Sequence, residues 1–257
     1  MTFLPPVPLY EPAAAALVLL VSGHLLADFL LQNQRLADAK GQRPGLMLLH
    51  GLLTLVTHLV VLFPLWSVRT LLVILALSFV HLLQDSIKAR LERDGQRRLL
   101  VFTADQTLHG VFLLLAWLVL RPGLPEARAL FLLPAPWLAP YTACLLITAG
   151  LAFNGTGGTT IVRRLLERYP ATLGGITERD HNTYAMGRTI GILERLLVFV
   201  LVLLDQWAAL GLVLAAKSIA RFKELERQAF ADYYLIGTLA SLLVAVASGI
   251  AVRWILG

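Results

Sequence analysis

Residues 13–31 read AAAALVLLVSGHLLADFLL, a run of 19 residues in which Ser22, His24 and Asp28 are the polar side chains. A helix needs roughly 20 such residues to cross the hydrocarbon core of a bilayer. The whole chain has this character, because 58% of its 257 residues are hydrophobic and only 15% are charged. A soluble domain is about one quarter charged, so the surplus of apolar surface indicates a membrane protein.

Further apolar runs follow along the chain. The predicted spans are residues 13–31, 46–66, 70–87, 99–120, 130–153, 190–216 and 234–256. The run 190–216 is one long helix or two short helices that turn near Asp205 and Gln206. We therefore predict an all-α, polytopic transmembrane helix bundle with seven or eight spans. Its predicted domains are a four-helix repeat domain over residues 1–122 and a C-terminal domain over residues 123–257, with a basic cytoplasmic loop at 154–188.

Basic residues predict the orientation of the spans. The loops after the first and third spans carry eight Lys and Arg, whereas those after the second and fourth carry three. Because basic loops stay in the cytoplasm, the N-terminus is expected outside. The basic residues that follow 216 must then also be inside, which favours a hairpin and eight spans. The net charge of +6 is assigned to these loops and to anionic lipid, so no nucleic acid is expected.

Two motifs occur twice. HLLAD at 24–28 recurs as HLLQD at 81–85, and LHG at 49–51 recurs at 108–110. Each copy is a two-helix hairpin with a basic loop between its motifs, so both copies keep one orientation and form a parallel repeat. The copies differ in places, since Asp105 aligns with Leu46 and His58 aligns with Trp117.

The repeated motifs predict a cluster of ionisable side chains. Residues four apart share a helix face, so each Asp at this spacing projects with its His. Four imidazoles and up to three carboxylates are expected to meet at one depth, nearer the cytoplasmic side, where ionisable groups face one another or a cavity. The predicted metal ligands are His24, Asp28, His50, His81, Asp85, Asp105 and His109, and the predicted catalytic carboxylates are Asp28, Asp85 and Asp105.

The ligand types narrow the choice of metal. Imidazoles and carboxylates suit zinc, manganese or iron, and the lack of cysteine ligands disfavours copper(I). Seven ligands suit two ions, or one ion whose histidines are oriented by the remaining carboxylates. A buried hydrogen-bond network or a proton relay without metal explains the same residues. The single cysteine, Cys144, excludes sites built from several cysteines.

Basic residues of the second half form a weaker pattern. A Gly-rich stretch, NGTGGTT at 154–160, is expected to form a turn before a basic helix, and such a turn can hold an anion. A flexible loop with arginines at the membrane surface is the alternative. The candidate residues for binding an anionic group of a substrate are Arg163, Arg164, Arg195, Lys217 and Arg221.

Four stretches carry a resemblance to a known family. They are GHLLADFLLQ from Gly23, LLHG from Leu48, HLLQDSIKARL from His81 and DQTLHG from Asp105. With them, roughly the first 120 residues resemble a family of bacterial polytopic membrane proteins catalogued as a domain of unknown function. GRTIGILERLL, AAKSIARFKEL and YYLIGTLAS look like the C-terminal extension of its longer members. The resemblance implies a multi-pass protein of the bacterial inner membrane and supplies no activity.

The leading hypothesis is a membrane-embedded, metal-dependent hydrolase. Its substrate would be a lipid or a lipid-linked molecule reached from the cytoplasmic leaflet, and membrane lipids would be its partners. A metal-ion or proton transporter that uses the same cluster is the rival, although transporters commonly have inverted repeats and a site at the midplane. A non-catalytic membrane partner or sensor is the third hypothesis. The oligomeric state is left open.

Overall fold

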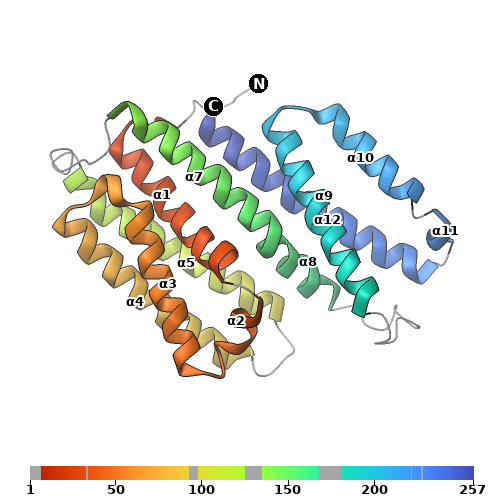
Figure 1. The fold of residues 1–257 in the computed structure, drawn as a ribbon, viewed down its shortest axis with the longest axis horizontal. Coiled ribbons are helices and arrows are strands. Elements are labelled where there is room, and N and C mark those ends of the chain that lie inside the picture. The colour runs from red at the N-terminus through yellow and green to blue at the C-terminus, as the bar shows by residue number, and fades with distance from the viewer. Residues whose placement is uncertain are drawn as a thin grey trace. The chain divides into compact units, whose positions relative to one another are not determined.

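A computed structural model of the chain describes residues 7–32, 34–92, 98–124, 135–167, 181–220, 222–226 and 228–257 (Figure 1). Every regular element in these ranges is a helix, which confirms the all-α prediction. Six helices are long and apolar enough to cross a membrane: Pro12–Leu31, Pro44–Val61, Val68–Leu91, Arg98–Gly123, Leu138–Leu166 and Phe230–Leu256. By the length and composition of these helices, the chain is a multi-pass membrane protein.

The first compact unit comprises residues 1–152 together with 256–257. Four long helices pack in a ring, in which α1 contacts α3, α3 contacts α4, α4 contacts α5, and α5 returns to α1 (Figure 1). Their bounds are Pro12–Leu26 for α1, Pro44–Val61 for α3, Val68–Leu91 for α4 and Arg98–Leu120 for α5. The unit also includes α7 (Leu138–Ala152), which packs along α1.

This ring places corresponding helices of the two repeats opposite each other. The helices that carry HLLAD and HLLQD, α1 and α4, stand across the bundle from one another, as do α3 and α5. Such an arrangement is expected when two similar hairpins pack around one axis along the membrane normal. The inner faces of all four helices therefore meet in one interior.

Local sequence explains where these helices begin and end. Pro12 and Pro44 occupy the first turns of α1 and α3, where a missing N–H costs nothing. Ser67 caps α4 by accepting a hydrogen bond from the Thr70 amide at 3.1 Å. Pro64 lies in a 3-10 turn that ends α3 before its predicted limit at 66.

The C-terminal end of α1 widens into a π-helix, η1 (Ala27–Leu31). The Gln32 amide donates to the Ala27 carbonyl at 3.1 Å, the five-residue spacing of this helix type. A short helix, α2 (Gln34–Ala39), then leads to α3. Asp28 lies inside the π-helix, and such bulges are frequent at functional sites.

The second compact unit comprises residues 153–255. Its core includes Val198, Val202, Leu210 and Ala245. The helices are η7 (Phe153–Gly157), α8 (Gly158–Leu166), α9 (His181–Leu203), α10 (Trp207–Ala220), α11 (Phe222–Leu225) and α12 (Gln228–Leu256).

The chain between α9 and α10 makes the hairpin turn that was one of two alternatives for residues 190–216. Asp205 has a positive φ of 60° at the turn, and α10 packs back on α9. The Arg253 guanidinium, followed by the Trp207 indole N–H, holds the pKa of the Asp205 carboxyl below its ordinary value. With 14 residues, α10 is about 21 Å long, short of the roughly 30 Å of a hydrocarbon core, so a full crossing by α10 stays a prediction.

The Gly-rich stretch 154–160 differs from the predicted turn. It is helical, passing through η7 into α8, so that Leu138–Leu166 is one continuous helical run. Gly158, the first residue of α8, has a reason to lack a side chain, because a Cβ added there would lie 2.8 Å from Arg195 Nε. The remainder of the predicted basic loop includes 168–180, outside the described residues.

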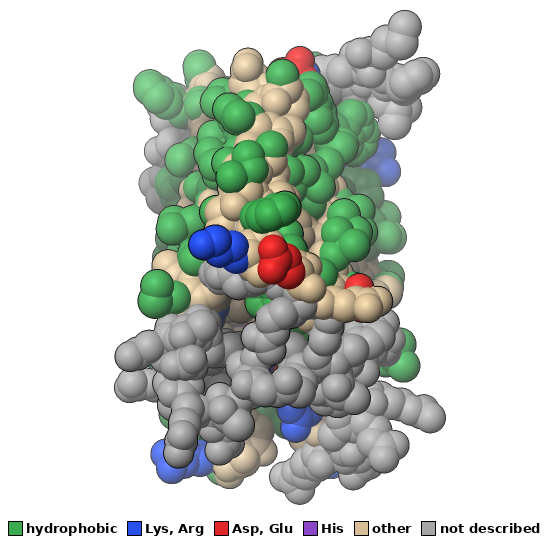
Figure 2. All heavy atoms as spheres, turned by 90° about the vertical axis from the view of Figure 1, so that its right-hand side faces the viewer, with side chains coloured by type: hydrophobic (Ala, Val, Ile, Leu, Met, Phe, Trp, Pro, Cys, Tyr) green, Lys and Arg blue, Asp and Glu red, His purple; other side chains and the backbone are tan. Residues whose placement is uncertain are grey.

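Large apolar side chains point outward along the helices. Leu72, Phe79 and Leu212 expose 62%, 68% and 72% of their surfaces. Figure 2 shows one face of the molecule, on which hydrophobic side chains predominate among the described residues. Exposed apolar patches of this extent are rare on soluble monomers, so these surfaces are suited to contact with lipid chains.

Candidate metal centre

The ring of four helices brings all seven predicted metal ligands into its interior. Each is 0–9% exposed, and each comes from a position that the sequence placed on an inward face. The contributing elements are α1 with His24, η1 with Asp28, α3 with His50, α4 with His81 and Asp85, and α5 with Asp105 and His109. Residues from both repeats therefore share one site.

Asp28, His50 and His81 form a first triad of potential ligands. Asp28 Oδ1 lies 3.4 Å from Nε2 of both histidines, and the two Nε2 atoms are 2.9 Å apart. Zinc bonds of about 2.0–2.1 Å set tetrahedral ligand atoms roughly 3.3–3.4 Å apart. These three side chains, which come from three helices, thus approach the spacing that a metal ion needs.

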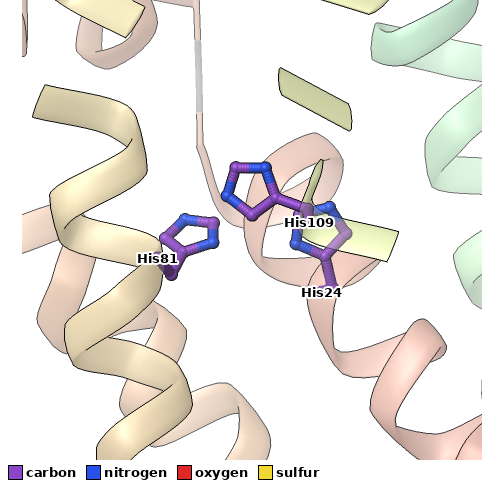
Figure 3. Close-up of side chains that lie close together, drawn as sticks. All are labelled: His24, His81 and His109. Carbon is purple, nitrogen blue, oxygen red and sulfur yellow. The ribbon is translucent and has the colours of Figure 1, made fainter. Parts of the chain in front are cut away.

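His24, His81 and His109 form a second triad. The rings of His24 and His109 stack with centroids 4.8 Å apart, and the His81 centroid lies 4.4 Å from that of His109. Figure 3 shows the His81 ring facing the other two across the interior of the bundle. The two triads share His81, so they describe neighbouring parts of one centre.

Hydrogen bonds orient two of the imidazoles by their Nδ1 atoms. His109 Nδ1 lies 2.8 Å from the Asp105 carbonyl, and His58 Nδ1 lies 2.8 Å from the Thr54 carbonyl. A carbonyl can only accept, so each Nδ1 carries the proton and each Nε2 presents a lone pair, the usual state of a metal-binding histidine. His58, two turns deeper than His50, packs against Gly23 and belongs to neither triad.

Several buried atoms of the cluster lack a well-aligned hydrogen bond within the described part of the chain. They are Asp28 Oδ1, His50 Nδ1, Asp85 Oδ1 and His109 Nε2. Buried polar atoms are nearly always satisfied by protein, water or an ion. Asp28 Oδ1 and His109 Nε2, one in each triad, are acceptor atoms that a cation would satisfy, so the donor set fits a divalent metal.

Two lysines of the site were not predicted from the sequence. Lys40 was counted as a basic loop residue, yet it is 8% exposed, and its Nζ lies 2.6 Å from Asp85 Oδ2 and 3.2 Å from Gln32 Oε1. Lys88 Nζ lies 2.7 Å from Asp105 Oδ2. The sequence offers a signal for Lys88, because it follows Asp85 by one helical turn and therefore lies on the same face of the helix. Nothing in the sequence marks Lys40, because its place depends on how the loop folds back.

The lysines separate the three carboxylates into two kinds. Asp85 and Asp105 each bind an ammonium group, whereas no lysine or arginine is paired with Asp28 among the described residues. Asp85 Oδ2 is also 3.1 Å from His50 Nε2. Asp28 is therefore the carboxylate whose charge is not already paired with an ammonium group, and it is the one that belongs to a triad, while Asp85 and Asp105 are held beside it.

Gln106 connects the second lysine pair to the histidines. Its Nε2 donates to Asp105 Oδ2 at 3.2 Å, and its Oε1 lies 3.4 Å from His24 Nε2. The amide thus bridges an aspartate of α5 and a histidine of α1. Nothing in the sequence indicates this role, because a lone glutamine on a helix has many alternatives.

Among the candidate anion-binding residues of the second unit, Arg195 has its hydrogen bonds within the protein. Arg195 is 4% exposed and donates to the Asn154 carbonyl at 2.7 Å and to Thr159 Oγ1 at 2.5 Å. Two more bonds reach Ser241 Oγ and the Gly155 carbonyl. These acceptors lie partly on the π-helix η7, so Arg195 satisfies backbone carbonyls there.

The other basic candidates lie nearer the surface of the second unit or outside the described residues. Lys217 Nζ pairs with Glu194 Oε2 at 2.6 Å, and Arg163 Nε lies 3.8 Å from Glu167 Oε1. Arg164 is partly exposed on α8. Arg221 is outside the described residues. Their assignment to substrate binding stays a prediction.

Comparison with known proteins bears on the first unit. Residues 16–131 match a family described as "Protein of unknown function (DUF3307)". This match confirms the resemblance over the repeat region and ends before the second unit begins. No curated protein and no solved structure matches the chain. The roles of the motif residues and the C-terminal extension stay predictions.

Proposed function

We propose that the first unit is a membrane-embedded metalloenzyme, a hydrolase that acts on a lipid or lipid-linked substrate from the cytoplasmic leaflet. The observation that carries the proposal is the convergence of Asp28, His50 and His81 from three helices, with ligand atoms 2.9–3.4 Å apart in the bundle interior. Unpaired charges inside a membrane are costly, and their grouping marks a functional centre.

The proposed ligands are Asp28, His50 and His81 of the first triad, with His24 and His109 of the second completing the site. Zinc, manganese or iron suits this set of nitrogen and oxygen atoms. Because His81 belongs to both triads, we favour one ion over two. Such an ion would polarise the substrate and activate water.

The paired aspartates have a separate proposed role. Asp85 Oδ2 lies 3.1 Å from His50 Nε2 and 3.4 Å from His81 Nε2, so it stands beside the proposed ion, where it would accept a proton from the attacking water. Asp105 lies beside His109 and Gln106 and orients the second triad. In this proposal neither aspartate has to leave its lysine for the metal to bind.

Access from one side distinguishes an enzyme from a pore. On the side of the cluster away from the basic loops, the large side chains that are at most 1% exposed are apolar apart from His58: Leu19 and Leu20 of α1, Ile74 of α4, Leu120 of α5, Leu62 and Leu65 after α3, and Leu124 after α5. On the other side lie Lys40 and Lys88. A polar centre with mostly apolar packing at one end suits a substrate that arrives and leaves through the other end.

The proposed membrane and orientation follow from loop charge and from the family resemblance. The lysine side of the cluster carries the two most basic loops of the first unit, so we place it in the cytoplasm and the N-terminus outside. The resemblance to bacterial proteins points to the inner membrane.

A proton or metal-ion transporter is the second candidate, favoured by one specific contact. Lys40, Asp85, His50 and His81 form an unbroken series of polar contacts of 2.6, 3.1 and 2.9 Å. Without metal, one extra proton shared by the two imidazoles would neutralise the cluster, which is how a proton relay would work. The apolar packing beyond the cluster ranks this candidate below the enzyme.

Elemental analysis of the detergent-purified protein tests the proposal. We expect about one equivalent of a transition metal in the wild type and none in His24→Ala/His81→Ala. His58→Ala is the matched control, because His58 is equally buried but outside both triads, and it should retain the metal. Full occupancy in the double variant, or no metal in the wild type after loading and washing, would sink the proposal and leave the relay, or a purely structural cluster, as the explanation.

A further inference from the structure

Two lysines stand beside the proposed metal ligands, one at each triad; Lys40 is buried and Lys88 is partly buried. Lys40 binds Asp85, which contacts His50 and His81 of the first triad. Lys88 binds Asp105, which lies 3.5 Å from His109 of the second triad. Both belong to the loop side of the cluster, because Lys40 follows α2 and Lys88 lies in the last turn of α4.

Charge balance in this interior calls for an anion once a metal is bound. Three carboxylates, two ammonium groups and one divalent ion leave a single positive charge when the histidines are neutral. A net charge away from water is expensive unless a counter-charge neutralises it. A second ion would raise the excess to three positive charges, so an anion is needed for neutrality whether one ion or two are bound.

The internal repeat shows that the second lysine pair is not needed to build a hairpin. Lys88 and Asp105 correspond to Leu31 and Leu46 of the first repeat, at the same offsets of 57 and 59 residues as the shared motifs. Replacing a buried ion pair by apolar side chains is often neutral or stabilising. The pair in the second repeat therefore has a use other than helix packing.

We propose that Lys40 and Lys88 form an anion subsite that takes the phosphate group of the substrate beside the metal. The inference rests on the proposed function and narrows its substrate class to phosphate esters. A phosphate offers several charged acceptor oxygens and one or two negative charges, which matches two ammonium donors and the excess positive charge. A neutral carboxylic ester would leave that charge in place.

Phosphate binding by the metal-loaded protein tests the subsite in two arms. One arm titrates inorganic phosphate by calorimetry in detergent, and the other adds phosphatidic acid to the micelles, with diacylglycerol as the phosphate-free reference. Binding in the lipid arm alone assigns the phosphate to a lipid headgroup, and binding in both arms assigns the site to the phosphate group itself. Binding of free phosphate alone supports the subsite with a water-soluble ester as substrate.

The decisive variant is Lys88→Leu/Asp105→Leu, which copies the first repeat. Loaded with excess metal to the occupancy of the wild type, it should bind phosphate about 10- to 100-fold more weakly, the effect of one lost charge-assisted contact. Lys40→Met/Asp85→Asn, brought to the same metal occupancy, is the second variant and should show the same loss. Arg69→Met is the control, because Arg69 is an exposed cation in the first turn of α4, at the opposite end of that helix from Lys88, and it should bind as the wild type does.

The outcomes separate the subsite from the metal centre. Metal-loaded wild type that binds neither probe, or binding that is equal in the wild type and in Lys88→Leu/Asp105→Leu, overturns the phosphate subsite and leaves the metal centre intact. A wild type that holds no metal overturns both proposals, because the cluster is then left with excess carboxylate charge that repels phosphate.

Discussion

In the first hairpin, α1 with η1 and α3 carry His24, Asp28 and His50; in the second, α4 and α5 carry His81, Asp85 and His109 at the corresponding positions. Around these shared positions the charges differ. Asp28 has no lysine partner in the described residues, whereas Asp85 binds Lys40. The second hairpin also has the Lys88–Asp105 pair where the first has two leucines.

This difference separates two kinds of position in one site. Residues that occur in both hairpins are the histidines and aspartates that meet at the proposed metal. The charged residues that the site takes from one hairpin alone, Lys40, Lys88 and Asp105, lie around the proposed metal. Two similar hairpins could therefore have built a symmetric metal centre, which unequal charges then specialised. Substitutions at matched positions test this division.

The largest expected effect is the loss of metal on removing His81, the histidine that belongs to both triads. We expect His81→Ala to weaken metal affinity by more than about 100-fold, because support residues alone already account for about 10- to 100-fold. Its counterpart His24 belongs to one triad, so His24→Ala should cost less. Competition with a chelator in detergent measures both. Equal losses for the two variants would contradict the central place of His81.

The two repeated aspartates should differ in their effect on stability. Asp85→Asn leaves Lys40 buried beside a neutral amide, so the metal-free protein should lose about 3–5 kcal/mol of unfolding free energy. Asp28→Asn leaves no ammonium group without its partner, so it should lower the unfolding free energy by less than about 2 kcal/mol. It should nevertheless reduce metal affinity more than Asp85→Asn does. Reversible unfolding in mixed micelles provides the measurement. Lys40→Met added to Asp85→Asn should recover part of the loss, and a further loss in that double variant would refute the pairing.

The Lys88–Asp105 pair is expected to be nearly neutral for stability when both residues are changed. Lys88→Leu/Asp105→Leu should change the free energy of unfolding by about 1 kcal/mol or less, whereas Lys88→Leu alone should cost about 2–3 kcal/mol by leaving Asp105 unpaired. A double-mutant cycle gives the coupling between the two residues. A double variant as unstable as the single one would mean that the second hairpin cannot accept leucines at the two positions where the first hairpin has them.

Apolar length and repeated motifs predicted the membrane helices and the residues that meet between them. The bounds of α5, and of α1 taken together with η1, agree with the apolar runs to within one residue, whereas α4 begins two residues before its predicted run and ends four residues after it. The agreement follows because lipid requires an uninterrupted apolar helix. Repetition identified His24 and His81 as partners although 57 residues separate them. The apolar helices and the repeated motifs can be recognised from the order of residues along the chain, without knowledge of how the helices pack.

Features that depend on tertiary packing could not be predicted in this way. The return of Lys40 into the bundle is set by the fold of a loop whose basic residues otherwise suggest a solvated surface. The helical state of the Gly-rich stretch 154–160 depends on Arg195, whose guanidinium meets carbonyls of η7 from a different helix. Glycines in isolation favour a turn, so the prediction at this stretch was wrong.

The smallest expected effect concerns His58 and Trp117, which align in the repeat but differ in their hydrogen bonds. His58 Nδ1 donates within its own helix, to the Thr54 carbonyl, whereas Trp117 Nε1 donates to the Ala13 carbonyl of α1 at 2.7 Å and so ties α5 to the first turn of the neighbouring helix. Trp117→Phe should lower the unfolding free energy by about 1 kcal/mol, the usual net value of one hydrogen bond. The loss is limited to this value because the phenyl ring keeps most of the apolar contacts of the indole.

Trp66→Phe is the matched control for that substitution. Trp66 Nε1 also donates to a backbone carbonyl, that of Leu59 at 2.9 Å, but at an exposed position where other partners can replace it. A smaller loss for Trp66→Phe than for Trp117→Phe would assign the difference to the contact between helices. Equal losses of unfolding free energy in Trp66→Phe and Trp117→Phe would mean that the hydrogen bond between α5 and α1 adds no stability of its own. The two hairpins would then differ only in the charges around the proposed metal and in the volumes of the side chains at positions 58 and 117.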